Sequence, residues 1–223
     1  MTRKKSDESA CPTCGDGCQW QEEALRLRAE VEELSSLVAT DPVTGLFNYR
    51  HFKQVLQTEM DRSKRGSIPT SLVLAGIDHF KAVNDEHGHE AGNEVLKQIA
   101  AICRGELRTT DVVCRYVGEV IAIIFPETHL NLAVKVADRI RREIAETPIQ
   151  VDGGEVRVTV SMGASVYVKT SVIDLVDFID SVDRFLNEAK QSGRNCICHI
   201  DFNELRSVTE IGAPERVLRI ARD

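Results

Sequence analysis

The sequence predicts a mixed α/β fold in which helices cross a sheet that is rich in antiparallel strands. Residues 71–77 form an apolar run of strand length, which is typical of a strand buried in the middle of a sheet. Residues 112–116 and 120–125 are two further strand-like stretches separated by only Val117-Gly118-Glu119, which predicts a β-hairpin. Helical patterns alternate with these strands, so the order of elements favours a palm-like or ferredoxin-like sheet over a doubly wound one.

The N-terminal part of the chain predicts a stalk helix over residues 19–40. Its apolar residues recur at alternating steps of four and three, which is a heptad pattern, and charged residues fill most of the other positions. The pattern indicates a short parallel coiled coil that joins two chains into a homodimer through residues 20–38. A single amphipathic helix packed on its own domain is the alternative. The apolar positions are Trp20, Ala24, Leu27, Val31, Leu34 and Val38.

The main domain is expected over residues 41–200, because Thr40-Asp41-Pro42 breaks the helical pattern. Helices are predicted where apolar residues return every three or four positions, and strands where apolar residues alternate or gather between turns. These rules add helices over 51–65, 90–103, 133–145 and 172–191, a strand over 156–168 and an edge strand over 195–200. Residues 201–223 form a C-terminal extension, in which a short helix is expected over 213–221.

Length and composition fit one main domain with appendages. The chain has 223 residues, of which 42% are hydrophobic, and this suffices for one full core but not for two large domains. A formal net charge of −7 gives no general attraction to nucleic acid or anionic lipid. No apolar stretch has the length of a membrane span or the place of a signal sequence, so we expect a cytoplasmic protein. The seven cysteines are an odd number and several lie in apolar segments, so no disulfide framework is expected.

The predicted hairpin places carboxylates where they could hold a metal. Its tip carries Gly118-Glu119, and the buried strand over residues 71–77 is followed directly by Asp78. Carboxylates from two strand ends can hold Mg²⁺ over the phosphates of a nucleotide, because Mg²⁺ fills its octahedron with a few carboxylates and with phosphate and water oxygens. A solvated turn glutamate is the alternative reading of Glu119.

Five motifs in order give the stretch from Asp41 to Asn195 a resemblance to the GGDEF family of diguanylate cyclases. They are Asp41-Pro42-Val43-Thr44-Gly45-Leu46-Phe47-Asn48, Ile77-Asp78-His79-Phe80-Lys81-Ala82-Val83-Asn84-Asp85, Gly88-His89-Glu90-Ala91-Gly92-Asn93, Arg115-Tyr116-Val117-Gly118-Glu119-Val120-Ile121 and Ala189-Lys190-Gln191-Ser192-Gly193-Arg194-Asn195. The resemblance implies the palm-like mixed sheet of a nucleotide cyclase, flanked by helices. It also implies a dimer of two half-sites, each holding GTP and Mg²⁺, in which each 3′-hydroxyl attacks the α-phosphate of the other GTP.

The chain departs from the family at the metal and hairpin positions. The family's first metal carboxylate, two residues before Asp78, is Gly76 here, and glycine has no side chain that could bind a metal. The signature reads Val117-Gly118-Glu119-Val120-Ile121, so the second glycine and the acidic metal ligand are kept and the other three positions have changed. A β-branched side chain at Val117 hinders the approach of a phosphate to the backbone. The resemblance therefore implies a degenerate site, with Glu119 and Asp78 as residual catalytic candidates and Glu119 as a weak Mg²⁺ ligand.

The same resemblance points to residues that would bind substrate. Asn84 stands at a guanine-contact position, and its acidic partner in the family is Asn93 here, whose amide cannot offer the same pair of charged acceptors. Lys81, Lys190 and Arg194 stand at phosphate-binding positions, and solvated charges at helix ends are the alternative reading. Losing one charge-stabilising group raises a barrier by several kcal/mol, so binding could survive where catalysis does not.

A second nucleotide site of the family is intact. Arg108-Thr109-Thr110-Asp111 has the RxxD form and lies at the family's distance before the hairpin. The resemblance implies that Arg108 contacts a guanine or phosphate of cyclic di-GMP and that Asp111 accepts from a guanine edge, and the planar guanidinium suits that contact. An RxxD tetrapeptide alone is a frequent chance match, so its position relative to the hairpin carries the prediction.

Residues 1–18 form a tail that carries Cys11, Cys14 and Cys18, a CxxC pair with a third thiol four residues on. Zinc normally takes four ligands, and no fourth lies nearby in the sequence. A zinc site completed by another chain, an iron–sulfur centre, a redox pair and a reduced tail without metal are all compatible with this pattern.

The hypothesis that these features favour is a degenerate GGDEF protein, without useful diguanylate cyclase activity, that acts in cyclic di-GMP signalling. It would serve as a cyclic di-GMP receptor through the RxxD site, as a dimeric module for an unidentified protein partner, or as both. Mg²⁺ is expected only if GTP binds. A weak but active cyclase that makes cyclic di-GMP from two GTP molecules is the first alternative, and a purely structural interaction domain is the second.

Overall fold

The computed structural model describes residues 23–27, 39–152, 154–200 and 219–221, and contacts divide the chain into two units, Met1–Ala39 and Thr40–Asp223. The described residues of the first unit are 23–27, which are helical, and Ala39, which is not. The rest of the predicted stalk up to residue 38, most of the C-terminal extension, and Cys11, Cys14 and Cys18 lie outside the described residues. No helix in the described part of the chain is long and apolar enough to cross a membrane.

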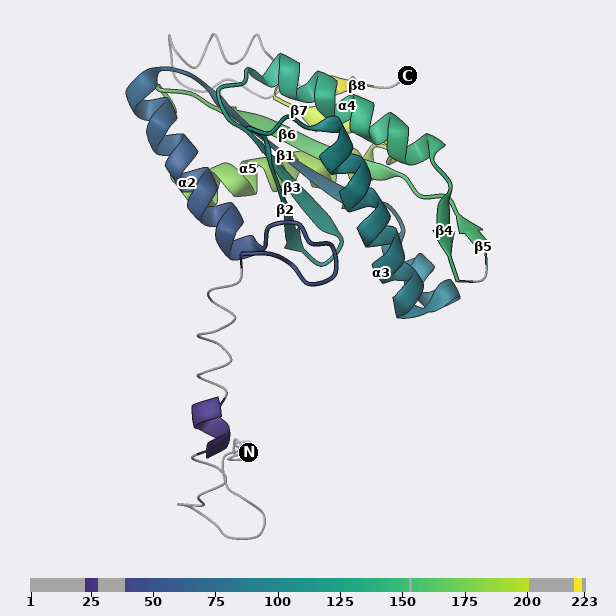
Figure 1. Ribbon diagram of the computed structural model, residues 1–223. Helices are drawn as coiled ribbons and strands as arrows, with labels where there is room; N and C mark the ends of the chain where they lie inside the picture. Colours follow the sequence, from purple (N-terminus) through teal and green to yellow (C-terminus); the bar gives the residue numbers. More distant parts are fainter. Residues whose placement is uncertain (1–22, 28–38, 153, 201–218, 222–223) are drawn as a thin grey trace, which may run out of the picture. The chain divides into compact units, whose positions relative to one another are not determined.

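The main sheet of the second unit is built from β1 (Thr70–Ile77), β2 (Val112–Val117), β3 (Val120–Phe125), β6 (Val160–Tyr167), β7 (Ile197–His199) and β8 (Arg219–Ala221). Their order in the sheet is β2-β3-β1-β6-β7-β8 (Figure 1). β1 lies between antiparallel β3 and β6, and all of its residues are buried, as its apolar run predicts. The β6–β7 pair is parallel and the other pairs are antiparallel.

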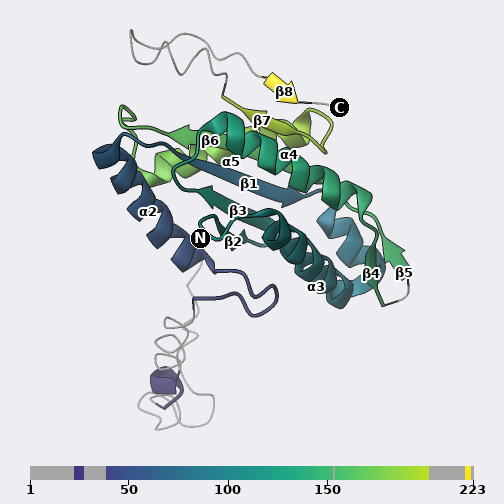
Figure 2. The same ribbon diagram turned by 45° about the horizontal axis from the view of Figure 1, so that its top comes forward.

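Four described helices cover the two faces of this sheet: α2 (Tyr49–Gly66), α3 (Phe80–Glu106), α4 (Leu130–Glu146) and α5 (Leu175–Gln191). α3 and α4 lie in front of the sheet in Figure 1 and share a core with Val73 and Ala75 of β1. α2 and α5 share a second core with Leu72 and Leu74 on the opposite face, and α5 lies behind the sheet in Figure 2. Successive residues of β1 thus point to opposite cores. The predicted mixed α/β fold with an antiparallel-rich, palm-like sheet is confirmed.

Local chemistry explains where these elements begin and how closely they pack. The side chain of Asn48 accepts a hydrogen bond from the His51 backbone N–H at 3.0 Å and so caps α2. α5 lies directly on β6 because Gly163 has no side chain. A Cβ atom there would stand 2.3 Å from both the Leu186 nitrogen and the Val182 oxygen of the helix backbone.

The helix predicted over 90–103 is the second part of a longer element. α3 already begins at Phe80, and only Gly88, with φ 84° and ψ 164°, departs from helical geometry within it. The polar segment that follows β1 is therefore also helical. Glycine takes this positive φ without the penalty that a Cβ atom would bring, so the chain turns at Gly88 and continues as a helix.

Three further elements correct the expectations from sequence. The strand predicted over 156–168 is divided, because β5 (Gly154–Val156) pairs with β4 (Ile149–Val151) in a separate two-stranded sheet and β6 begins only at Val160. The strand predicted at the sheet edge is internal, since β7 pairs with both β6 and β8. Residues 219–221, expected to be helical, form β8 on the hydrogen-bonding edge that β7 offers.

Candidate functional site

The tip of the β2–β3 hairpin is fastened to the end of β1. Gly118 has a φ of 57°, in the left-handed region that favours glycine at a turn. Its carbonyl accepts a hydrogen bond from the Arg115 Nε at 3.0 Å, and the carbonyl of Glu119 accepts one from the Ile77 N–H at 3.3 Å. These bonds fix the direction of the Gly118-Glu119 turn relative to the strand end where Gly76 lies.

An ion pair joins this hairpin to the start of the domain. Both oxygens of the Asp41 carboxylate accept hydrogen bonds from the Arg115 Nη1, at 3.2 and 3.1 Å, and Thr44 donates to the same carboxylate from its backbone and its hydroxyl. Burial raises the pKa of the Asp41 carboxyl. The Thr44 hydrogen bonds and the Arg115 charge outweigh burial, so the pKa lies below its ordinary value of 3.8. Arg115 is therefore held by two partners at the base of the hairpin.

One pocket of about 380 Å³ brings together most of the predicted substrate residues. Its walls come from the first and second parts of α3 and from the hairpin. The Asn84 side chain can lie against α3 only because residue 92 is glycine, since a Cβ atom there would stand 1.9 Å from the Asn84 Oδ1. The lining residues are Phe80, Lys81, Asn84, Asp85, His89, Asn93, Leu96, Arg115, Gly118 and Glu119.

Asp78, predicted as a residual catalytic candidate, does not line this pocket. Only 4% of its surface is exposed, and its carboxylate accepts hydrogen bonds from the hydroxyls of Thr159 and Ser161, each at 2.7 Å. It also accepts one from the Asn195 N–H at 3.1 Å. Asp78 thus ties β1 to the start of β6 and to the loop after α5, and both of its carboxylate oxygens accept hydrogen bonds from within the domain.

The two predicted phosphate residues near the end of α5 lie in different settings. Arg194 is exposed and follows Gly193 in a loop where φ is 107° at Gly193, 61° at Arg194 and 45° at Asn195. The buried Arg141 stabilises this strained loop, because it donates hydrogen bonds to both the carbonyl and the side-chain oxygen of Asn195. The sequence patterns did not single out Arg141, which lies far away in the chain on α4.

Lys190 lies against Gly76. A Cβ atom at Gly76 would stand 3.0 Å from the Lys190 Cε and 3.1 Å from its Nζ, so the end of the lysine side chain occupies the space next to this glycine. A side chain at position 76 would therefore meet the ammonium group directly. The ammonium group thus lies close to the point at which a side chain at position 76 would begin.

The residues present do not fit a divalent metal well. In the described part of the chain no group of three or more histidine, cysteine, aspartate or glutamate side chains is placed to hold a metal ion. Gly76 supplies no ligand, Asp78 is consumed by internal hydrogen bonds, and the Lys190 ammonium lies beside Gly76. Of the predicted metal carboxylates, only Glu119 lines the pocket.

The RxxD turn, Arg108 to Asp111, lies before β2, and its first residue, Arg108, is exposed. The Asp111 carboxylate accepts a hydrogen bond from the Arg108 backbone N–H at 3.0 Å, and the Asp111 N–H donates to the Arg108 carbonyl at 3.1 Å. The Arg108 side chain is exposed, and its guanidinium makes no hydrogen bond or ion pair with a described residue. The turn therefore presents a free guanidinium beside a fixed, half-buried carboxylate.

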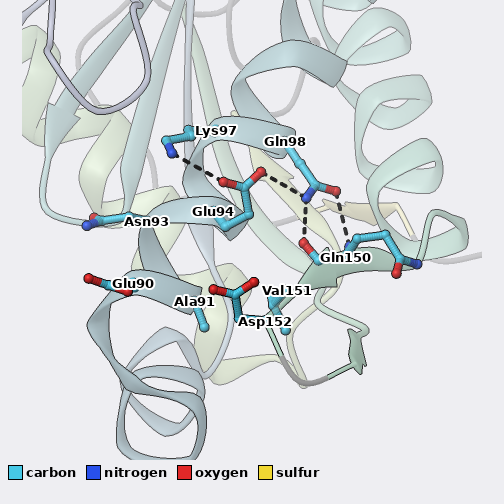
Figure 3. A pocket seen from close by; sticks show the side chains of 9 residues that line it. All are labelled: Glu90, Ala91, Asn93, Glu94, Lys97, Gln98, Gln150, Val151 and Asp152. Atoms are coloured by element: carbon cyan, nitrogen blue, oxygen red, sulfur yellow. Dashed lines mark hydrogen bonds and ion pairs between the residues drawn. The ribbon is translucent and has the colours of Figure 1, made fainter.

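A larger hollow of about 560 Å³ adjoins the first pocket and shares Asn93 with it. Figure 3 shows the side chains that line this larger hollow. Glu94 accepts hydrogen bonds there from Lys97 and Gln98, which lower the pKa of its carboxyl, with Gln98 as the larger cause. Gln98 also bonds to the Gln150 backbone across to β4. Because its lysine is already paired and its other charged groups are carboxylates, this hollow is less suited to a phosphate than the pocket at the hairpin.

The helices on both faces of the mixed sheet give the domain a palm-like α/β fold. A family model described as "Diguanylate cyclase, GGDEF domain" matches residues 38–196. The chain belongs to the GGDEF domain family.

Known relatives and solved structures agree with this membership. The response regulator PleD of Caulobacter vibrioides is 34% identical over 172 residues, which cover 77% of this chain and 38% of PleD. A crystal structure of the coiled coil and GGDEF domain of DgcB from Caulobacter crescentus, in complex with c-di-GMP, has a TM-score of 0.69 and 25% identity, covering 81% of this chain and 95% of that one. The structure of diguanylate cyclase SiaD with its activator SiaC from Pseudomonas aeruginosa also has a TM-score of 0.69, with 30% identity, covering 81% of this chain and 68% of that one. The chain spans well under half the length of PleD.

Proposed function

We propose that this GGDEF-family chain has no useful diguanylate cyclase activity and acts in cyclic di-GMP signalling as a receptor for the dinucleotide through Arg108 and Asp111. The contact between Gly76 and Lys190 carries the first half of the proposal. A cyclase needs charge compensation where the α-phosphate is attacked, and preorganised groups of this kind supply much of an enzyme's rate enhancement. This chain lacks a carboxylate at position 76. Val117, which is 60% exposed, stands in the hairpin where the family has its first glycine, and a β-branched side chain there hinders the approach of a phosphate to the backbone.

The receptor half of the proposal is supported by the geometry of the RxxD turn. Asp111 is fixed by the backbone of its own turn, while the Arg108 guanidinium is free to form paired hydrogen bonds with a guanine edge or a phosphate. The DgcB structure, one of the solved structures similar to this chain, holds c-di-GMP.

Calorimetric titration of the purified protein with cyclic di-GMP tests this half. We expect saturable binding, and we expect Arg108→Ala to weaken it on the order of tenfold to a hundredfold, the usual effect of removing a hydrogen bond to a charged group. Arg157→Ala removes an exposed arginine outside the RxxD turn and serves as the control, with affinity unchanged. Absence of binding, or equal binding by the native protein and Arg108→Ala, would refute the receptor assignment.

A slow cyclase is the second candidate, and the pocket lining is the observation that favours it. Lys81, Asn84 and Glu119 face one cavity, so a nucleotide and a single metal could be held there with Glu119 as the carboxylate. In that case the protein would convert GTP with Mg²⁺ to cyclic di-GMP, and Glu119→Ala would abolish the conversion. Formation of cyclic di-GMP that Glu119→Ala does not remove would exclude this mechanism.

We also propose that the chain is a homodimer joined through residues 20–38, and that it serves a protein partner. The heptad pattern supports the dimer, and residues 23–27 are helical. SiaD, one of the similar structures, is in complex with an activator protein. Light scattering after size-exclusion chromatography should give a mass of two chains, and Leu27→Asp should lower it to one. A native mass of one chain would contradict the dimer.

A further inference from the structure

A hollow of about 960 Å³ lies beside α5, the helix behind the sheet in Figure 2. Its lining comes from the end of β6, the loop that leads to α5, the outer side of α5 and Ile200, which follows β7. It shares no lining residue with the hairpin pocket, and the RxxD turn does not contribute to it. A molecule bound in this hollow would therefore leave both nucleotide sites open.

The hollow offers apolar surface to a bound molecule. Val166 and Phe185 are nearly buried in its lining, whereas Val172 is 97% exposed and Ile173, next to it, is also exposed. Val176, one helical turn further on, is 62% exposed. Single exposed apolar side chains are common on protein surfaces, but several that gather beside an apolar hollow are typical of an interaction site.

Carboxylates line the side of the hollow that α5 forms. Asp177, Asp180 and Asp183 follow one another at steps of three residues along this helix, and all three line the hollow. Asp177 lies in the first turn, where a negative charge stabilises a helix, but Asp180 and Asp183 lie beyond it. Neither Asp177 nor Asp180 forms an ion pair with a described residue. Arg184 carries the only positive charge among the described lining residues.

Two hydroxyl groups in the lining already have partners within the domain. The Ser171 hydroxyl accepts a hydrogen bond from the Val168 N–H at 3.1 Å, and the Ser181 hydroxyl donates one to the Phe178 carbonyl at 2.7 Å. The carboxylates of α5 are therefore the polar groups most available to a bound molecule. They repel the phosphates of nucleic acid and anionic lipid and attract lysine and arginine side chains.

The C-terminal extension of the chain does not match this charge. Residues 201–218 continue from Ile200, which lines the hollow, and they carry more acidic than basic residues. The acidic residues are Asp201, Glu204, Glu210 and Glu215, and the basic residues are Arg206 and Arg216. Because like charges repel, charge complementarity favours a basic partner over this segment as the occupant of the hollow.

We propose that this hollow is a docking groove for a basic, amphipathic helix of a partner protein. The apolar side chains of that helix enter the hollow beside Val172 and Ile173, and its lysine or arginine side chains pair with the aspartates of α5. Amphipathic helices bind in this way, with the apolar face in a groove and the charges at the rim selecting the partner. The inference rests on the proposal that the chain serves a protein partner, and it adds the place and the chemistry of that contact.

Fluorescence anisotropy of a labelled, helical peptide of leucine and lysine tests the groove on the full chain. We expect saturable binding, and a matched peptide with glutamate in place of lysine should bind at least about tenfold more weakly, because its charges repel those of α5. Asp177→Asn together with Asp180→Asn should weaken binding of the lysine peptide about three- to tenfold, as expected for two exposed ion pairs.

A matched double variant controls for the general attraction between an acidic protein and a basic peptide. Glu86→Gln together with Glu90→Gln removes the same charge from exposed positions on α3 and should bind the lysine peptide as the native protein does. Two single variants keep the test decisive if the aspartate variant does not fold. Arg184→Gln should tighten binding about threefold, a gain that an unfolded protein would not show. Val172→Ser should weaken it about three- to tenfold.

Several results would overturn the inference. They are no binding of the lysine peptide, equal affinities of the two double variants, and an affinity that Arg184→Gln leaves unchanged. Binding that appears only with Phe202→Ser would assign the groove to residues 201–218. A mass that falls from two chains to one in the Asp177 and Asp180 variant would assign it to a second copy of the chain.

Failure of the proposed function looks different, because the peptide titration contains no nucleotide. Cyclic di-GMP that does not bind, or that the protein makes from GTP, would refute the proposed receptor or the absence of cyclase activity and would leave the peptide result unchanged. Absence of peptide binding would remove the docking groove and leave the test of Arg108 unchanged.

Discussion

Asp78 offers the sharpest test of the idea that this carboxylate holds the fold together and does not serve a metal. Its oxygens accept hydrogen bonds from Thr159 and Ser161 at 2.7 Å and from the Asn195 N–H at 3.1 Å, and the residue is 4% exposed. Asp78→Ala would leave two hydroxyls and one backbone N–H without their acceptor at the junction of β1, β6 and the loop after α5.

The size of the effect follows from these three bonds. Each hydrogen bond to a charged group contributes about 1.5–3 kcal/mol, and neighbouring bonds are not additive, so we expect Asp78→Ala to lower the free energy of unfolding by about 3–5 kcal/mol. Asp78→Asn keeps the shape of the side chain and one accepting oxygen, so it should lower the free energy of unfolding by only about 1–2 kcal/mol.

Urea unfolding followed by far-ultraviolet circular dichroism measures both variants. Asp85→Ala, at an exposed aspartate seven residues further on, is the control and should change the free energy of unfolding by less than about 0.5 kcal/mol. Asp78 is a metal ligand, and its structural role is refuted, if Asp78→Ala has the same urea midpoint of unfolding as the native protein but a lower affinity for Mg²⁺.

Three further outcomes follow from the described contacts. Asp41 contributes stability above its ordinary pKa of 3.8 and loses that contribution as the pH falls through its lower folded-state pKa. The difference in free energy of unfolding between the native protein and Asp41→Asn should therefore narrow from about pH 5 towards pH 2. A difference that stays constant in acid denaturation curves would contradict this. Gly163→Ala forces a Cβ atom against the backbone of α5 and should lower the free energy of unfolding by about 3 kcal/mol or more, as measured by thermal unfolding. Gly105→Ala is the control, because a Cβ atom there has no atom within 4 Å, and it should be neutral or stabilise α3 by up to about 1 kcal/mol. Equal melting temperatures of the two variants would show that α5 can move away from β6. Burial raises the pKa of the Cys103 and Cys114 thiols to about 12. Iodoacetamide at pH 8 should therefore modify these thiols only after urea is added, and mass spectrometry identifies the modified residues. Modification in the native protein would mean that these sites open readily.

Much of the fold could be predicted from local patterns, since the apolar stripes of α2, α4 and α5 and the buried run of β1 depend on neighbouring residues. The elements that differ from the prediction depend on contacts with residues far away in the sequence. β8 exists as a strand through its pairing with β7, and the first part of α3 is polar and ends at Gly88, so no apolar periodicity marked it. Separating β5 from β6 required knowledge of the β4 pairing.

The candidate site was predictable in its residue types and less so in its geometry. The motif spacing pointed to Lys81, Asn84 and Glu119, which the structure brings to one pocket. Sequence alone could not show that Asp78 is turned to internal donors, because those donors stand on other elements. The absence of a carboxylate at Gly76 could be read directly from the sequence. That a lysine from α5 lies over that glycine could be seen only in three dimensions.

A turnover assay shows whether this GGDEF domain binds nucleotides without making cyclic di-GMP. The purified full chain is incubated with GTP and Mg²⁺, and the nucleotides are separated by liquid chromatography with mass detection. We expect GTP to persist and no cyclic di-GMP to accumulate, for the native protein and for Glu119→Ala alike. Cyclic di-GMP that forms with the native protein and disappears with Glu119→Ala would contradict this expectation.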